Sequence, residues 1–252
     1  MARKKRARLS PLTVIGELLL LGGLGVLGYI VWQPWYALTV VANSQQVNID
    51  RLTSEWTPEV ASQEELPVPE VNEGTEPWGV MYAPALGDTW AYRIADGVGR
   101  PDPLDDIEKG VGRYTETDLP GQIGNFALAA HRNTTIAPFR NIEYLRIGDE
   151  IYIETKDGWY TYVYRNAEVV TPDTTEVLND FPYQLGGSVQ DSTLTLTSCY
   201  PKDGAALRLI AFANFEGFTP RADGPPEKLA QVNPSVGSES GAKTGVGSET
   251  AS

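Results

Sequence analysis

The sequence predicts a mainly β domain, a barrel or sandwich with one or two short helices, preceded by a single membrane-spanning helix at the N-terminus. Two observations favour the β architecture: the apolar runs between residues 80 and 212 are short and strand-like, and Gly, Pro or Asp separates nearly all of them. A third observation, a mostly apolar stretch at 12–32, predicts the helix. The length of 252 residues and a hydrophobic content of 41% suit one sizeable folded domain with appendages.

The N-terminal 1–11 is expected to be a basic tail in the cytoplasm, because four consecutive basic residues begin at Arg3. The stretch 12–32 has the roughly 20 apolar residues that cross a hydrocarbon core of roughly 30 Å. Positive charge before this stretch, with no comparable run after it, predicts that the rest of the chain lies outside the cell membrane. A cleaved signal peptide is the alternative, and it would also export the bulk of the chain.

Two further segments are expected to lack a packed core of their own. The acidic, Pro-rich segment 37–77 predicts an extended stalk outside the membrane, and 222–252 is so poor in large apolar residues that it predicts a disordered tail. The folded domain is therefore expected at 78–221. The net charge of -13 would repel the phosphates of nucleic acid, so we expect no nucleic-acid partner.

Seven segments of the expected domain have the short apolar pattern of strands, bounded by turn residues. They are 80–82, 90–94, 125–130, 150–155, 159–170, 193–198 and 207–212. The best helical stretch within the domain is short and lies at about 137–145. This combination is typical of a β-barrel or sandwich with small helices on its surface.

The only cysteine, Cys199, ends an alternating strand on which Thr195, Thr197 and Cys199 share one face. The turn residues Asp203-Gly204 follow, and positions 199 and 208 are equally far from that turn, so a symmetric hairpin would oppose Cys199 and Arg208. A guanidinium beside a thiol favours the thiolate and can donate hydrogen bonds to an oxyanion. The alternative is a core cysteine with a surface arginine that pairs with a carboxylate.

The only histidine, His131, stands where the apolar run 125–130 ends. A lone histidine can be merely structural, but a thiol, an imidazole and a guanidinium together supply the nucleophile, acid/base and charge stabiliser of thiol acyl transfer. One Cys and one His cannot build a usual structural zinc site, and no G-x-S-x-G motif or Gly-rich phosphate loop is present. The acidic run with Asp102, Asp105, Asp106 and Glu108 is expected to be a solvated turn rather than a calcium site.

The run Thr195-Leu196-Thr197-Ser198-Cys199 resembles the TLxTC-type active-site strand of the sortase family, with Arg208 at the usual short distance beyond it. The segments 84–87, 110–114, 120–126 and 129–132 are similar to the actinobacterial class E branch of that family. The resemblance extends over about residues 80–214, which is almost the whole expected domain.

This resemblance implies an eight-stranded β-barrel that cuts an LPxTG-type or LAxTG-type sorting signal, near the C-terminus of other exported proteins, between Thr and Gly. The enzyme would then join the Thr to an amine of a cell-wall precursor, a molecule like lipid II. By the same resemblance Cys199 is the nucleophile, His131 the proton carrier and Arg208 the oxyanion donor. No metal or organic cofactor is implied.

Residues beside Cys199, namely Thr197, Ser198 and Tyr200, are expected to bind the signal, together with Thr135 in the loop after His131. The segment 133–136 lacks the tyrosine that is associated with an LAxTG preference, which leaves the second residue of the signal open. No second apolar span lies near the C-terminus, which favours wall anchoring over pilus assembly. The alternative function is a non-catalytic exported β-domain, a scaffold or adhesin with a buried, unreactive thiol.

Overall fold

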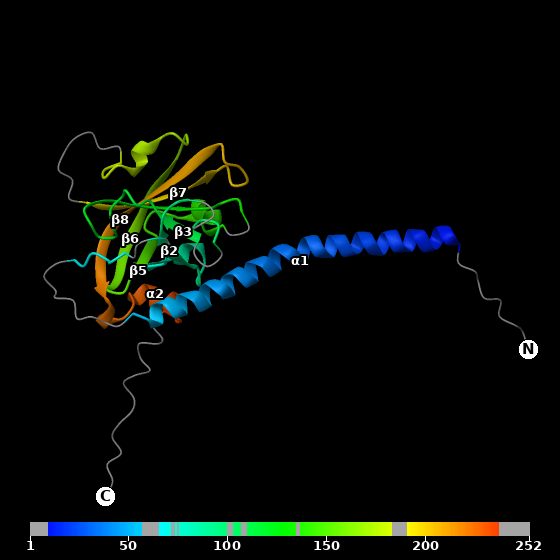
Figure 1. Ribbon diagram of the computed structural model, residues 1–252, viewed down its shortest axis with the longest axis horizontal. Coiled ribbons are helices and arrows are strands. Elements are labelled where there is room, and N and C mark those ends of the chain that lie inside the picture. The colour runs from blue at the N-terminus through cyan, green and yellow to red at the C-terminus, as the bar shows by residue number, and fades with distance from the viewer. Residues whose placement is uncertain are drawn as a thin grey trace, which may run out of the picture. The chain divides into compact units, whose positions relative to one another are not determined.

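The computed structural model in Figure 1 describes residues 10–56, 66–71, 74, 76–99, 103–106, 110–134, 137–182 and 191–236. Contacts within the chain separate two compact units, residues 1–42 and residues 43–252. The first unit contains the apolar stretch, and the second contains the β domain.

A single helix, α1 (Pro11–Ser54), accounts for the N-terminal apolar stretch and continues beyond it. Its part Pro11–Gln33 has a mean hydropathy of 2.1 and is long and apolar enough to cross a membrane, a test that a signal sequence would also pass. The predicted apolar helix at 12–32 is confirmed. The structure adds that the helix runs on to Ser54.

Eight strands form a closed barrel in the order β1-β2-β3-β4-β7-β8-β6-β5, which confirms the predicted architecture (Figure 1). The pairs β2–β3 and β4–β7 are parallel, and the other neighbours are antiparallel. The strands are β1 (Gly79–Tyr82), β2 (Ala91–Asp96), β3 (Gly110–Arg113), β4 (Gly124–Ala130), β5 (Glu150–Glu154), β6 (Gly158–Val170), β7 (Ser192–Tyr200) and β8 (Leu207–Pro220).

Short helices surround the barrel. The 3-10 helix η2 (Pro138–Tyr144) confirms the helical stretch that the sequence predicts at 137–145. The others in the described part of the chain are η1 (Pro84–Leu86), η3 (Thr175–Leu178), η4 (Arg221–Asp223) and the α-helix α2 (Glu227–Val232).

Strand β3 is the one strand that our reading of apolar segments missed. Its sequence is Gly-Val-Gly-Arg, in which valine is the only residue with an apolar side chain. Gly112 has a structural role there. A Cβ atom at this position would lie 2.1 Å from the carbonyl oxygen of Gly97 and 3.1 Å from Cγ of Pro103. The glycine therefore lets the connection between β2 and β3 lie directly against the strand.

The inside of the barrel is the main hydrophobic core, and alternate residues of each strand point into it. Each buried aliphatic or aromatic side chain contributes roughly 1.5–3 kcal/mol to folding relative to an exposed one. The core includes Met81, Ile94, Val111, Phe126, Leu128, Ile151, Ile153, Tyr160, Tyr162, Leu194 and Leu196.

A second cluster covers part of the outer surface of the barrel, and we call it the docking face. Ile49 of α1 and Leu229 of α2 pack there in one cluster with barrel residues of β1, β2, β5 and β6. The end of α1 and the short helix α2 thus share one side of the barrel (Figure 1). The barrel residues are Val80, Tyr82, Ala91, Tyr152 and Trp159, and Val236, Leu52 and Trp56 complete the cluster.

The docking face corrects two expectations from composition. The segment 37–77 is not an extended stalk where the structure describes it, since α1 is helical to Ser54 and Tyr160 donates a hydrogen bond to the carbonyl oxygen of Pro67 (2.6 Å). The tail 222–252 is folded as far as residue 236, and Leu229 is only 1% exposed. A few apolar residues are enough to fold both segments against the barrel, because the barrel provides the surface that buries them. Residues 57–65 and 237–252 lie outside the described part.

Candidate active site

The β7–β8 hairpin has the register that the turn symmetry predicts, with Cys199 paired directly with Arg208. Paired residues of an antiparallel ladder point to the same face of the sheet. Cys199 is a free, half-buried thiol, and Thr197, on the same face, is 5% exposed. The thiol therefore sits where this face of β7 begins to open to solvent.

His131 reaches the same place because β4 and β7 are parallel neighbours. The ladder pairs Ala129 with Thr197, and one residue further along both strands the Ser198 hydroxyl donates to the carbonyl oxygen of Ala130 (2.8 Å). The next residues are His131, the first residue after β4, and Cys199, which is still within β7. They therefore lie on adjacent segments at the same level of the barrel.

The imidazole of His131 has a carboxylate partner that the sequence did not indicate. Its Nε2 lies 2.6 Å from Oδ1 of Asp105, and the two side chains are 11% and 31% exposed. Asp105 belongs to the connection between β2 and β3, in the acidic run that we expected to be a solvated surface turn. For Asp105 this expectation is wrong, and Asp102 and Glu108 of that run lie outside the described residues. Within the described ranges, no three His, Cys, Asp or Glu side chains gather as metal ligands.

Arg132, the residue after His131, links the two strand ends. Its Nη1 donates to the carbonyl oxygen of Cys199 (3.4 Å), and its guanidinium lies 5.6 Å from the centre of the Tyr200 ring. Its Nη2 forms an ion pair with Oε1 of Glu143 at 2.8 Å. No local sequence pattern indicates this role of Arg132, because it depends on a contact between distant segments.

The electrostatics of Glu143 follow from this pair. Partial burial raises the pKa of Glu143, but the hydrogen bond and charge of Arg132, with the charge of Lys202, outweigh it and lower the pKa below its ordinary value. Lys202 lies in the turn of the β7–β8 hairpin, with Nζ 3.7 Å from Oε1 of Glu143. Glu143 therefore connects the end of β4 with that turn through two cations.

The guanidinium of Arg208 lies along its own hairpin turn. Nη1 donates to the carbonyl oxygens of Ala205 (3.1 Å) and Leu207 (3.0 Å). An arginine has five N–H donors, so these two bonds still leave donors for a further partner. The backbone places Arg208 opposite the thiol, while the side chain is held by neutral carbonyl groups.

The residues expected to bind substrate have different environments. Thr197 shares the face of Cys199 and exchanges a hydrogen bond with the hydroxyl of Tyr114 (3.1 Å), a residue that our site prediction missed. Tyr200 is 37% exposed beside Arg132. The hydroxyl of Ser198 differs from these two side chains, because it is buried and bonded to the carbonyl oxygen of Ala130. Thr135 lies outside the described residues.

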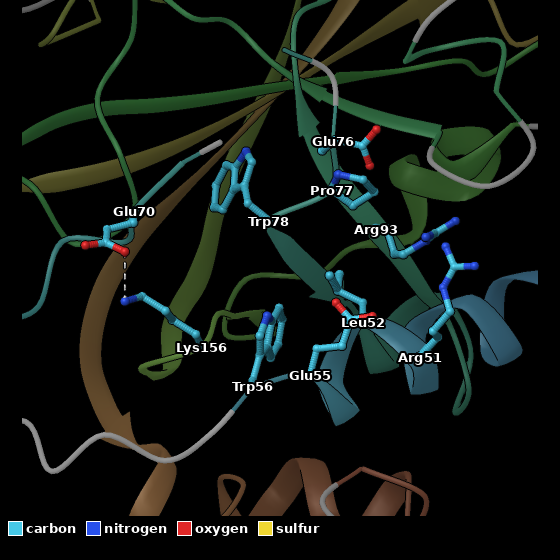
Figure 2. A pocket seen from close by; sticks show the side chains of 10 residues that line it. All are labelled: Arg51, Leu52, Glu55, Trp56, Glu70, Glu76, Pro77, Trp78, Arg93 and Lys156. Atoms are coloured by element: carbon cyan, nitrogen blue, oxygen red, sulfur yellow. Dashed lines mark ion pairs between the residues drawn. The ribbon is translucent and has the colours of Figure 1, made fainter. Parts of the chain in front are cut away.

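A pocket of about 300 Å³ lies elsewhere on the barrel unit, and none of the predicted site residues lines it. Its lining residues include three cations and three carboxylates, with an ion pair between Lys156 and Glu70 (3.1 Å), which is drawn as a dashed line in Figure 2. The mixed charges favour neither anions nor cations as ligands. Its lining residues are Arg51, Leu52, Glu55, Trp56, Glu70, Glu76, Pro77, Trp78, Arg93 and Lys156.

Comparison with known proteins agrees with this architecture. The family model described as the Sortase domain matches residues 81–216. Sortase SrtE1 of Streptomyces coelicolor is 32% identical over 90% of this chain, which spans 64% of the length of SrtE1. The solved structure of sortase E from Streptomyces avermitilis is 36% identical, with a TM-score of 0.53 over 61% of this chain and 97% of that one.

A further solved structure is described as sortase E1 from Streptomyces coelicolor with a tripeptide in the active site. It is 32% identical, with a TM-score of 0.56 over 61% of this chain and 96% of that one. The matched region runs from within β1 to within β8 and contains the six strands between them in full. The chain therefore belongs to the sortase family of cysteine transpeptidases, and its relatives include class E members.

Proposed function

We propose that this chain is a membrane-anchored sortase that cleaves an LPxTG-like or LAxTG-like sorting signal between Thr and Gly and attaches surface proteins to the cell wall. One observation carries the proposal. The single cysteine is paired with Arg208 across the β7–β8 hairpin, and His131 leaves the adjacent parallel strand at the level of the thiol. The groups that we propose as nucleophile, acid/base and oxyanion donor are therefore contributed by β7, by the residue after β4 and by β8.

In the first step the thiolate of Cys199 attacks the carbonyl carbon of the signal threonine. A C–S bond forms while the carbonyl electrons move to oxygen, and the guanidinium of Arg208 donates hydrogen bonds to this oxyanion. The intermediate collapses with cleavage of the C–N bond, and His131 as imidazolium gives its proton to the departing glycine amine. The products are a thioester on Cys199 and the released C-terminal fragment.

In the second step the amine of a cell-wall precursor attacks the thioester. The new C–N bond forms, the C–S bond breaks and the thiolate returns, while His131 takes the proton that the amine loses. One amide bond is exchanged for another, so the reaction needs no oxidant or reductant. The acceptor amine would come from a molecule like lipid II.

Arg208 must release its hairpin carbonyl oxygens, at least in part, to serve as an oxyanion donor. The bonds to Ala205 and Leu207 are bonds to neutral acceptors, whereas a bond to an oxyanion is charge-assisted on both sides and about twice as strong. The developing negative charge therefore favours a shift of the guanidinium towards the oxyanion of the tetrahedral intermediate. Thr197 and Tyr200 flank the thiol and would contact the signal.

We also propose that α1 anchors the protein, with residues 1–11 in the cytoplasm and the barrel outside the membrane. The support is the apolar segment Pro11–Gln33, which follows a basic N-terminal run. A cytoplasmic basic tail and an exported barrel would place the thiol on the side where sorting signals and wall precursors occur.

The test is mass spectrometry of the full chain in detergent, incubated with LPxTG and LAxTG peptides and a small primary amine. The expected product joins the amine to the threonine, and comparison of the two peptides identifies the preferred signal. Cys199→Ala should give no product, whereas Arg165→Lys, a change at an exposed arginine of β6, should give the normal amount.

The competing function, a non-catalytic scaffold or adhesin, has a distinct outcome in the same experiment. Neither peptide would be cleaved, and Cys199 would resist alkylation by iodoacetamide in the folded protein. That result would overturn the proposed transpeptidase.

A further inference from the structure

The connection between β2 and β3 holds Asp105 in a defined position beside His131. The backbone N–H groups of Asp106 and Gly110 both donate to the carbonyl oxygen of Pro103 (3.3 Å each), which closes a turn around Asp105. Leu104 in the same turn is buried at 9% exposure. Asp105 is therefore attached to the barrel through a closed turn with a buried neighbour.

The backbone of His131 is also held in place, by a second contact. Its carbonyl oxygen accepts a hydrogen bond from the N–H of Phe139 (3.1 Å) at the start of η2. The backbone is thus fixed by η2, and the ring is fixed by Asp105 at 2.6 Å. With both anchors the ring has a defined orientation before any substrate is bound.

The contact with Asp105 also bears on which ring nitrogen carries the proton. An ionised carboxylate can only accept hydrogen bonds, so the nitrogen beside it must be an N–H group. We propose that Asp105 is a positioning residue, which keeps a proton on Nε2 of His131 and leaves Nδ1 as the nitrogen that exchanges protons with the substrate amines. The assignment of this exchange rests on the proposed function, whereas the position of the proton does not.

The effect on catalysis follows from the two forms of the ring. Neutral imidazole exists as two tautomers, and only the one with a free lone pair on the nitrogen facing the reaction can accept a proton there. A carboxylate beside the other nitrogen favours that tautomer and also stabilises the imidazolium formed when the proton arrives. Asp105 would therefore act in both halves of the transpeptidation.

Asp105→Asn tests this inference with little change of shape. An asparagine amide can donate to Nε2, which would move the neutral ring to the other tautomer, with its proton on Nδ1. We expect kcat for transpeptidation to fall by at least about tenfold and by at most the ~10⁴-fold that general acid–base catalysis can contribute, while KM for the peptide stays within about twofold. Asp106→Asn changes the same charge in the same turn and should leave kcat unchanged.

The chain has a single histidine, so its ring can be observed without ambiguity. Nitrogen-15 NMR spectra of the full chain in detergent, labelled at histidine, should show the neutral ring of the parent protein protonated at Nε2. In Asp105→Asn we expect the signal to shift towards the Nδ1-protonated form. Asp105→Ala, which supplies no partner, should give a mixture of both forms.

Each outcome bears on one hypothesis. An active parent protein with an unchanged kcat in Asp105→Asn would overturn the inference, and so would a lower kcat with an unchanged tautomer. If the parent protein cleaves neither peptide, the proposed function fails, while the NMR spectra still decide whether Asp105 fixes the proton. Thermal unfolding of Asp105→Asn shows whether a loss of activity reflects a loss of folded protein. If Asp105→Asn is unfolded, the tautomer of the folded Asp105→Ala variant decides whether Asp105 fixes the proton on Nε2.

Discussion

Two regions on the outer surface of this barrel use cations, carboxylates and aromatic rings in different ways. At the docking face Arg221 pairs with Glu154 at 2.8 Å, with side chains 11% and 3% exposed. At the candidate active site Arg132 pairs with Glu143 at the same distance, but the carboxylate is 31% exposed. The docking face buries both charges, whereas the site buries the cation and leaves the carboxylate in contact with solvent.

The difference is consistent with what each region has to do. The guanidinium of Arg221 lies 4.8 Å from the ring centres of both Trp56 and Trp159, so one side chain joins the end of α1, the barrel and η4. Burial raises the pKa of Glu154, and the neighbouring Arg221 and Tyr82 offset this only in part. Such a pair holds segments together but has no freedom to move. The carboxylates of the site, Asp105 and Glu143, keep partial contact with water, which can reorient as charge moves during a reaction.

The largest effect is expected for a change of Cys199, which should remove activity but leave stability almost unchanged. Cys199→Ala removes the nucleophile, and we expect turnover to fall by at least about 10⁴-fold, or roughly 5.4 kcal/mol of activation free energy. The midpoint of thermal unfolding should change little because the thiol is half-buried at the end of a strand. Residual turnover above one per cent would contradict the assigned nucleophile.

A change beside the docking face should do the opposite, and lower stability while leaving activity unchanged. Arg221→Ala leaves Glu154 buried without its cation, and we expect the free energy of unfolding to fall by ~3–5 kcal/mol, measured by urea titration with tryptophan fluorescence. The matched control Arg165→Ala removes an exposed arginine and should cost less than about 0.5 kcal/mol. At a temperature where Arg221→Ala remains folded, its kcat should equal that of the parent chain. A large loss of kcat there would mean that the two regions are coupled.

Arg208→Lys sharpens the comparison within the site. Lysine keeps the charge but lacks the planar set of donors, so kcat should fall by about 10²–10³-fold, the usual cost of losing an oxyanion donor. Arg165→Lys is the matched control and should keep its kcat. A normal kcat in Arg208→Lys would assign the oxyanion to another donor.

The smallest predicted effect concerns the pH dependence of stability, which should differ in sign between the regions. The folded pKa of Glu143 is lowered, so its contribution to stability is present above its unfolded pKa and is lost as pH falls through the folded pKa. The folded pKa of Glu154 is raised, so its contribution is present below its unfolded pKa and is lost as pH rises through the folded pKa.

Urea titrations of Glu143→Gln and Glu154→Gln between about pH 3 and pH 7 test this difference in sign. Stability relative to the parent should rise at low pH for the first variant and at higher pH for the second. For Glu143 the change should be below about 1 kcal/mol, because its carboxylate is partly solvated. Parallel curves for the two variants would contradict the opposite pKa shifts.

The parts of this molecule that were predictable from sequence depend on local patterns. The pairing of Cys199 with Arg208 follows from strand alternation and one turn, so residues close in sequence determine it. His131 at the end of its strand follows from a similar pattern. The eight-stranded topology came from the resemblance to sortases, since apolar patterning alone missed β3.

The parts that were not predictable depend on contacts between distant segments. Asp105 lies 26 residues before His131, in a run whose composition suits a solvated turn equally well. Leu229 appears isolated in a polar tail, and its burial depends on an outer barrel surface that no local pattern shows. The same holds for the end of α1, where Ile49 and Leu52 need the barrel as a partner.

The parallel ladder between β4 and β7 has a consequence for how the protein matures. Ser198 and Ala130, which this ladder joins, are 68 residues apart in the sequence. Pairings between such distant segments form late, because a long loop must close before any contact is gained. A nascent chain would therefore have no assembled candidate active site until the barrel closes. Recovery of activity during refolding should track barrel closure rather than formation of the local β7–β8 hairpin.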